Sequence, residues 1–292
     1  MTPALFIVAP LLFVLTFITP LYGQHNTPQV FLVKDAALTH LLIPKSTKAL
    51  GINLSSQFEV PEGSLPVLLT KGGNLYDLQK RAYYPHKKTL GITSFTISSS
   101  LFVVIRKDML GWYEDGTIRE RVKLPQTGLR IAAGPGQRIY VYGDRRPGSM
   151  IYLLEDGQEI PLVEISRGSI SALTAIRERI FYAVGNAIYT VAKGERPGLL
   201  FVAEGERLIR SLAIDPRVGV LYFSTGNAVY AMRAGIALSV LKGMECYLKY
   251  SGAALYALDP KAGRLVKITG LERLIFDEKG ESSPGPAGGF KE

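Results

Sequence analysis

The sequence predicts an all-β protein, a β-propeller of about six four-stranded blades. Three observations support this prediction: a hairpin motif that repeats about every 40 residues, Gly-Asn pairs between runs of alternating apolar residues, and a composition rich in glycine and aromatic residues. The 292 residues include 30 Gly, 15 Tyr and 12 Phe. Such a composition favours strands joined by tight turns, and the length is sufficient for one large domain.

The repeat is clearest between residues 180–191 and 221–232, which both contain Gly-Asn-Ala followed by an apolar residue and Tyr, 41 positions apart. An aromatic residue marks a related position in six units. These markers are Tyr76, Trp112, Tyr152, Tyr189, Tyr230 and Tyr256, with spacings of 36, 40, 37, 41 and 26 residues. A period near 40 residues with short strands is typical of propeller blades.

The best-defined unit divides into four strands at residues 170–175, 180–184, 188–191 and 199–203. Gly185-Asn186 joins the second strand to the third, because both residues tolerate the positive φ that a tight hairpin requires. Residues 117–124 alternate between a mainly apolar face and a basic face. This alternation is typical of an outer strand with one face in water.

The last repeat unit is short, and a closed propeller often completes its last blade with a strand from the other end of the chain. Residues 29–34 and part of residues 50–60 are the two candidates. The chain is therefore divided into a signal peptide or anchor at 1–23, an N-terminal extension at 24–46 that could complete the last blade, the propeller at 47–277 and a tail at 278–292. The tail is rich in Gly, Pro and Ser, which predicts disorder.

Residues 4–19 form an uncharged apolar run followed by polar residues from Gln24 onward. Its length is typical of a signal peptide ending near Gly23, and an uncleaved membrane anchor or a folded segment are the alternatives. The expected location is periplasmic or extracellular. Membrane contact is expected only if residues 1–23 are not cleaved.

Residues 213–223 resemble blades of the NHL, YWTD and gluconolactonase-like propellers. Residues 255–264 resemble a quinoprotein-type blade, although Val266 and Ile268 stand in the stretch where that type carries a tryptophan. The resemblance covers roughly residues 60–275 and concerns architecture alone. Because propellers include both enzymes and binding scaffolds, the function has to be inferred from the site.

In a propeller, the loops between second and third strands lie on the same face as the loops that join blades. The first three blades place basic residues there: Lys71, Arg106, Lys107, Arg145 and Arg146. Later blades place small neutral turns there, including Ser251-Gly252. Arginine pairs suit carboxylates and phosphates, and the net charge of +9 favours anionic partners. Ordinary solvated turns are the alternative interpretation.

The resemblance to gluconolactonase-like propellers implies a possible calcium site formed by Asn186, Asp215 and Asn227. Calcium sites usually include several carboxylates, and the inner strand at 170–175 offers none. No histidine follows His86, and no nucleophile triad, phosphate loop or zinc motif is present. The single cysteine, Cys246, lies in an apolar strand and is expected in the core.

These observations favour an exported, non-catalytic propeller that acts as a scaffold for a protein or an anionic envelope component. No catalytic residue and no cofactor is predicted, and export disfavours nucleic acid as a partner. The alternative function is a metal-dependent propeller hydrolase or lactonase that uses calcium.

Overall fold

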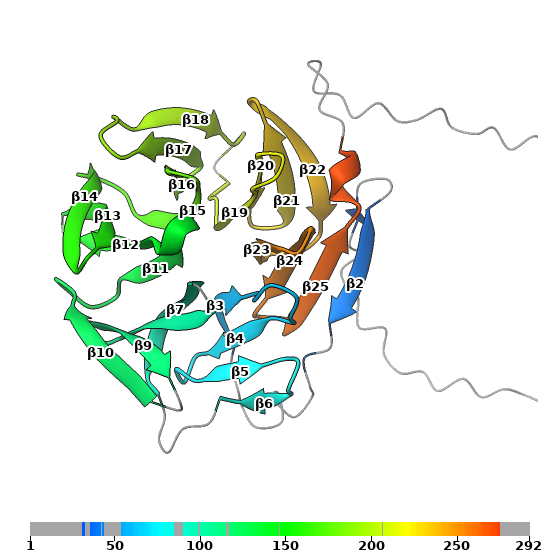
Figure 1. Cartoon of the computed structure of the whole chain (residues 1–292). Helices are drawn as coiled ribbons and strands as arrows, with labels where there is room; N and C mark the ends of the chain where they lie inside the picture. Colours follow the sequence, from blue (N-terminus) through cyan, green and yellow to red (C-terminus); the bar gives the residue numbers. More distant parts are fainter. Residues whose placement is uncertain are drawn as a thin grey trace, which may run out of the picture.

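A computed structural model describes residues 31–32, 36–41, 43, 54–84, 90–98, 100–114, 117–145, 147–205 and 207–274. Six antiparallel sheets stand around a central axis (Figure 1), which confirms the predicted six-bladed β-propeller. Apart from two short 3-10 helices at Pro135–Gln137 and Leu271–Arg273, the regular structure of this part of the chain is all β.

Each blade runs from an inner strand at the axis to an outer strand at the rim. From inner to outer, the first three blades are β3 (Leu54–Glu59), β4 (Val67–Thr70), β5 (Leu75–Asp77) and β6 (Ala82–Tyr83); β7 (Ile92–Ser98), β8 (Leu101–Arg106), β9 (Met109–Glu114) and β10 (Thr117–Lys123); and β11 (Arg130–Ala133), β12 (Ile139–Arg145), β13 (Gly148–Glu155) and β14 (Gln158–Ile165). The other three are β15 (Ile170–Ile176), β16 (Arg179–Val184), β17 (Ala187–Ala192) and β18 (Gly198–Val202); β19 (Ser211–Asp215), β20 (Val220–Ser224), β21 (Ala228–Arg233) and β22 (Ile236–Lys242); and β23 (Tyr247–Ser251), β24 (Ala254–Asp259), β25 (Arg264–Thr269) and β2 (Ala37–Leu41).

The fourth blade, β15 to β18, confirms the strand division predicted for residues 170–203. Gly185 has a φ of 60° in the turn between β16 and β17, as a tight hairpin requires. Five of the six aromatic markers lie on third strands, but Tyr256 lies on the second strand β24. This difference in position explains the short spacing of 26 residues before Tyr256.

The ring is closed by a different segment from the two candidates. Strand β2 pairs antiparallel with β25 and forms the outer strand of the sixth blade. Within residues 29–34, β1 (Phe31–Leu32) pairs instead with β22 and adds a fifth strand to the fifth blade. Within residues 50–60, β3 is the inner strand of the first blade. Closure by the N-terminal extension at 24–46 was correctly expected, but within it the closing strand is β2 and not residues 29–34.

The core lies between neighbouring blades, where apolar side chains from facing sheets interlock. Tyr222 stacks on Tyr250 between the fifth and sixth blades, with ring centroids 5.7 Å apart. Phe201 and Phe223 meet between the fourth and fifth blades. Cys246 is fully buried, as expected, and burial raises the pKa of its thiol, so it is not poised as a nucleophile.

The inner strands of neighbouring blades belong to different sheets and do not pair with each other. Polar side chains link each inner strand to the inner strand of the next blade instead. Gln57 on β3 donates from Nε2 to the Thr93 carbonyl and accepts the Phe95 amide on Oε1, at 3.2 Å each. The hydroxyls of Ser94 and Thr96 on β7 accept amides of β11, at 3.1 Å each. These bonds satisfy backbone groups that would otherwise lack partners.

The same kind of link continues around the ring. Arg130 donates to the Ser171 carbonyl at 3.2 Å, and the Ser171 hydroxyl donates to the Ile209 carbonyl at 2.7 Å. Ser211 accepts the Leu248 amide at 2.9 Å. A Lys249–Glu59 ion pair at 2.6 Å joins the sixth blade to the first. Every interface between blades therefore carries at least one polar bridge beside the axis.

Within the described ranges, no helix has both the length and the apolar character needed to cross a membrane. Residues 1–23 and the tail at 278–292, for which a signal peptide and disorder are predicted, lie outside these ranges.

Candidate functional site

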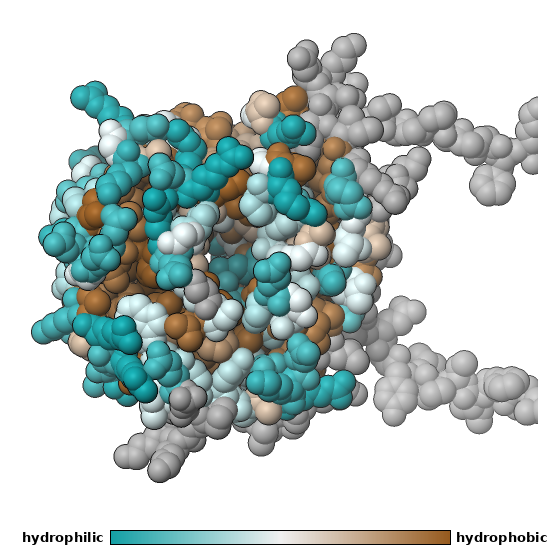
Figure 2. Space-filling model, viewed as in Figure 1, coloured by the Kyte–Doolittle hydropathy of each residue, from teal (hydrophilic) through white to brown (hydrophobic). Residues whose placement is uncertain are grey.

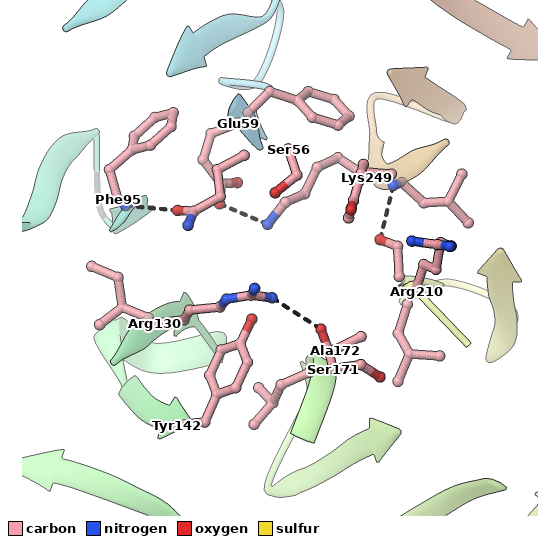
Figure 3. Close-up of a pocket in the computed structure, with 17 residues that line it drawn as sticks. Ser56, Glu59, Phe95, Arg130, Tyr142, Ser171, Ala172, Arg210 and Lys249 are labelled. Carbon is pink, nitrogen blue, oxygen red and sulfur yellow. Dashed lines mark hydrogen bonds and ion pairs between the residues drawn. The ribbon is translucent and has the colours of Figure 1, made fainter. Parts of the chain in front are cut away.

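The six inner strands surround a narrow polar channel, which is visible in the middle of Figure 2. The cavity has a volume of about 60 Å³, enough for a few waters or one small ligand group. Each blade contributes lining residues from its inner strand or from the residue just before it. The lining combines polar groups such as Ser56 and Gln57 with aromatic rings such as Phe95 and Tyr142 (Figure 3).

Three cations and one carboxylate line this channel. The cations are Arg130, Arg210 and Lys249, and the carboxylate is Glu59. Lys249 pairs with Glu59, and Arg210 pairs with Glu245 at 3.1 Å. Arg130 differs, because its hydrogen bond goes to a backbone carbonyl and no described carboxylate pairs with it. One positive charge in the channel is therefore not balanced by a neighbouring acidic group.

The surroundings of Arg130 suit an anion. Figure 3 shows its guanidinium directed into the channel, with the Tyr142 ring beside it. Across the cavity, Nε of Arg210 is buried and has no hydrogen-bond partner in the described part of the chain. A guanidinium presents a planar set of donors that matches a carboxylate or a phosphate. The channel can therefore hold such a group in the plane of the Arg130 side chain.

The basic residues predicted from the sequence lie in the turns between second and third strands. Lys71, Lys107 and Arg145 are exposed and form no ion pair with any described residue. Arg106 pairs with Glu120 on the outer strand of its own blade, which neutralises its charge. Arg146 lies outside the described residues. Because inner strands begin on the face that carries these turns, the basic turns surround the end of the channel that contains Arg130.

Two details of this face differ from the sequence analysis. Ser251-Gly252 connects the first strand of its blade to the second, so it lies on the opposite face. In the third blade, residues 144–149 are longer in the sequence than the corresponding turns and predict a binding loop, but Asp144 and Arg145 remain paired with Ser149 and Gly148. The extra residues lengthen a hairpin instead of forming a separate binding loop.

The three residues considered for calcium do not come together. Asn186 and Asn227 lie in turns between second and third strands, whereas Asp215 ends the inner strand β19 on the opposite face. Asn186 donates to the carbonyls of Ala203 and Gly205, which is a turn-stabilising role. No group of three or more His, Cys, Asp or Glu side chains in the described ranges is arranged to hold a metal ion.

Asp215 belongs to a cluster with Arg217 and Tyr250. Its carboxylate accepts bonds from Arg217 at 3.0 and 3.2 Å and from the Tyr250 hydroxyl. Burial by itself raises the pKa of Asp215, but the hydrogen bonds from Arg217 and Tyr250 outweigh it and hold that pKa below its usual value. Burial and the bond to Asp215 raise the pKa of Tyr250 to about 12. These contacts hold together the fifth and sixth blades.

The depressed pKa of Asp215 predicts acid sensitivity with a defined sign. The folded state keeps Asp215 ionised at a pH where the unfolded chain protonates it, so this group stabilises the fold above about pH 4 and stops doing so as the pH falls. The Asp215→Asn variant should therefore lose less stability than wild type between pH 7 and pH 3, as measured by urea unfolding. A parallel loss in both proteins would contradict this assignment.

Sequence reasoning missed Arg130, Arg210 and Lys249, because it sought function in the turns. A signal was available, since Arg130, Ser171, Ser211 and Lys249 recur about every 40 residues near the start of successive inner strands. Polar residues at a repeated inner position of a propeller face the axis, where ligands can reach them.

The sequence matches no protein-family model, and no curated protein is significantly similar to it. Solved structures are similar in fold. Virginiamycin B lyase from Staphylococcus aureus, in a catalytically inactive form with quinupristin, has a TM-score of 0.57 and 12% identity over 82% of this chain and 100% of that one. A gluconolactonase from Xanthomonas campestris has a TM-score of 0.56 and 13% identity over 82% of this chain and 91% of that one.

The extracellular domain of a putative one component system from B. thetaiotaomicron has a TM-score of 0.53 and 13% identity. The match covers 72% of this chain and 32% of that domain, so this chain spans about a third of its length. At these identities, the comparisons show the fold alone. They include enzymes and the extracellular domain of a one component system, and the function has to come from the channel and the face around it.

Proposed function

We propose that this protein is an exported, non-catalytic binding propeller that takes an anionic group at the end of its central channel. The group is a carboxylate or a phosphate, presented by a small ligand or by a partner protein of the envelope. The observation that carries the proposal is Arg130, a guanidinium in the channel without a described acidic partner. The unpaired Lys71, Lys107 and Arg145 on the same face would attract the same class of partner.

The calcium alternative predicts a calcium-dependent rise in the melting temperature of the wild-type protein. The export part of the proposal is supported by the extracellular domain from B. thetaiotaomicron, which has a similar fold. N-terminal sequencing of the protein recovered from envelope and culture medium tests export, with a mature terminus near Gln24 as the expected result.

Replacing Arg130 by Gln should weaken anion binding by about tenfold to a hundredfold, the usual contribution of a hydrogen bond to a charged group. Isothermal titration with inorganic phosphate and with succinate would measure this directly. The melting temperature of both proteins without ligand shows whether loss of the hydrogen bond to the Ser171 carbonyl also destabilises the fold.

Arg119→Gln is a matched control, because Arg119 is an exposed arginine on β10 that already pairs with Glu114. It should bind both anions as wild type does. Equal binding by wild type and Arg130→Gln, or no binding by wild type to either anion or to any cross-linked envelope partner, would reject the channel as the site.

A further inference from the structure

A groove opens at the rim between the fourth and fifth blades, and we call it the rim groove. Its volume is about 660 Å³, which is within the range of small-molecule sites. Aromatic rings of β18, β20 and β21 form its wall, and apolar residues of β22 continue it; these are Phe201, Phe223, Tyr230, Ile236 and Ala237. Figure 2 shows brown surface at the top of the ring, where β18 and β20 lie in Figure 1.

The rim groove is present because β18 is shorter than the outer strand of the preceding blade. The repeat places the pair Tyr182 and Tyr189 where the fifth blade has Phe223 and Tyr230, and the rings stack in both pairs, with centroids 5.4 and 5.0 Å apart. Strand β14 has eight residues and packs several apolar side chains into the cluster around the first pair. Strand β18 has five residues, and two of them join the cluster around the second pair. The shorter strand leaves space beside the second pair.

One end of the rim groove is polar and the other end is apolar. Thr225, which precedes β21, lies at the polar end with Glu204 and Arg207 from the segment that joins the fourth blade to the fifth. Gly235 lies in the turn after β21 and Ile236 begins β22, so they line the opposite end. A molecule with an apolar body and one polar group at its end would match this division.

Arg207 determines which polar group fits. Its guanidinium donates to the Tyr230 hydroxyl at 3.3 Å and forms no ion pair with any described residue. A neutral hydroxyl leaves the positive charge unbalanced, and a guanidinium has further donors that match a carboxylate. Glu204 lines the same end without pairing with Arg207. It therefore weakens the attraction for an anion but does not occupy the guanidinium.

We propose that the rim groove binds an organic anion with an apolar body that contains rings. The ligand rings pack on Phe201 and Tyr230, since aromatic rings favour offset or edge-to-face contacts. The anionic group of the ligand accepts hydrogen bonds from Arg207. The rim groove shares no lining residue with the central channel, so this site does not depend on the anion-binding proposal for Arg130.

Two fluorescent probes that differ by one charge test the site in the full chain. Anilinonaphthalene sulfonate carries a sulfonate, and phenylnaphthylamine has the same rings without it. Arg207→Gln should bind the sulfonate probe about tenfold more weakly than wild type does, because a hydrogen bond to a charged group is lost. Its affinity for the neutral probe should stay within about twofold of wild type. Fluorescence titration measures both affinities.

Arg167→Gln is the matched control, because Arg167 is exposed in the segment that joins the third blade to the fourth and does not line the rim groove. It should bind both probes as wild type does. Glu204→Gln should bind the sulfonate probe about twofold to threefold more tightly, because it removes a like charge from the polar end. Ala237→Phe places a ring in the rim groove and should weaken binding of both probes at least about tenfold.

Binding of neither probe by wild type would overturn the proposal, and so would equal sulfonate affinities of wild type and Arg207→Gln. Weaker sulfonate binding by Glu204→Gln would contradict an anionic ligand group. The melting temperature of each variant shows whether it is folded. A folded Ala237→Phe chain that binds both probes as wild type does would also overturn the proposal, because the probes would then bind elsewhere.

Discussion

A chain shortened to begin at Ile43 should fail to form a stable ring, whereas a chain shortened to begin at Ala36 should remain folded. The chain that begins at Ala36 loses β1, which contributes two residues at the edge of the fifth blade. The chain that begins at Ile43 also loses β2. The five residues of β2 pair with β25, from Ala37 opposite Thr269 to Leu41 opposite Leu265.

The loss of β2 removes backbone hydrogen bonds and exposes apolar surface together. Leu265, Val266 and Ile268 on β25 are fully buried, and Leu38 and Leu41 of β2 pack against the clusters that contain them. Together these losses should lower the free energy of unfolding by at least about 4 kcal/mol, which corresponds to about 10 °C in melting temperature for a domain of this size.

Thermal unfolding followed by near-ultraviolet circular dichroism compares the two shortened chains with the full chain. The chain that begins at Ala36 is the control, because it lacks the same N-terminal segment and β1 but retains the closing strand. Similar melting temperatures for both shortened chains would show that β2 does not hold the ring closed.

The double variant Ser94→Ala/Thr96→Val should lower the free energy of unfolding by about 2 to 4 kcal/mol. Both substitutions keep the apolar volume near that of the original side chain but remove the hydroxyls that accept the Ile131 and Ala133 amides. Ser94 and Thr96 are buried, so water cannot easily replace them. A buried amide left without an acceptor costs about 1–3 kcal/mol.

Urea unfolding of Ser166→Ala/Thr127→Val provides the comparison, since these two residues are exposed in turns and form no described hydrogen bond. That variant should stay within about 0.5 kcal/mol of wild type. Equal stability of the two double variants would mean that the bridges beside the axis contribute nothing to holding blades together.

The sequence predicts the blades because each one repeats the same local pattern of alternating residues and hairpin turns. Gly185 has the positive φ that its hairpin turn requires, and a Gly-Asn pair between alternating runs indicates such a turn from the local sequence. The closing strand is harder to predict, because residues 29–34, 37–41 and 54–59 are all short segments that could form a strand. These segments differ in the distant strand with which each one pairs. The local sequence pattern carries no information about that partner strand.

In the candidate site, too, some features can be predicted from the local sequence and others depend on distant contacts. Basic residues in turns can be placed on a face once the strand order is known, which locates Lys71, Lys107 and Arg145. Whether a charged side chain has an ion-pair partner depends on neighbouring strands and blades. Arg106 is neutralised by Glu120, whereas Arg130 in the channel has no described acidic partner. That Arg130 has no described acidic partner therefore becomes visible only when the blades are assembled.

The position of β2 also has a consequence for the order in which the molecule folds. Thr39 pairs with Lys267, so the first part of the propeller to leave the ribosome must wait for the last part to be synthesised. Blades built from neighbouring segments can form as the chain emerges, but closure requires a contact across nearly the whole sequence, and such contacts slow folding. Until β25 is made, β2 has no partner strand; until β2 then pairs with it, β25 has an open edge for which a chaperone or another strand could compete.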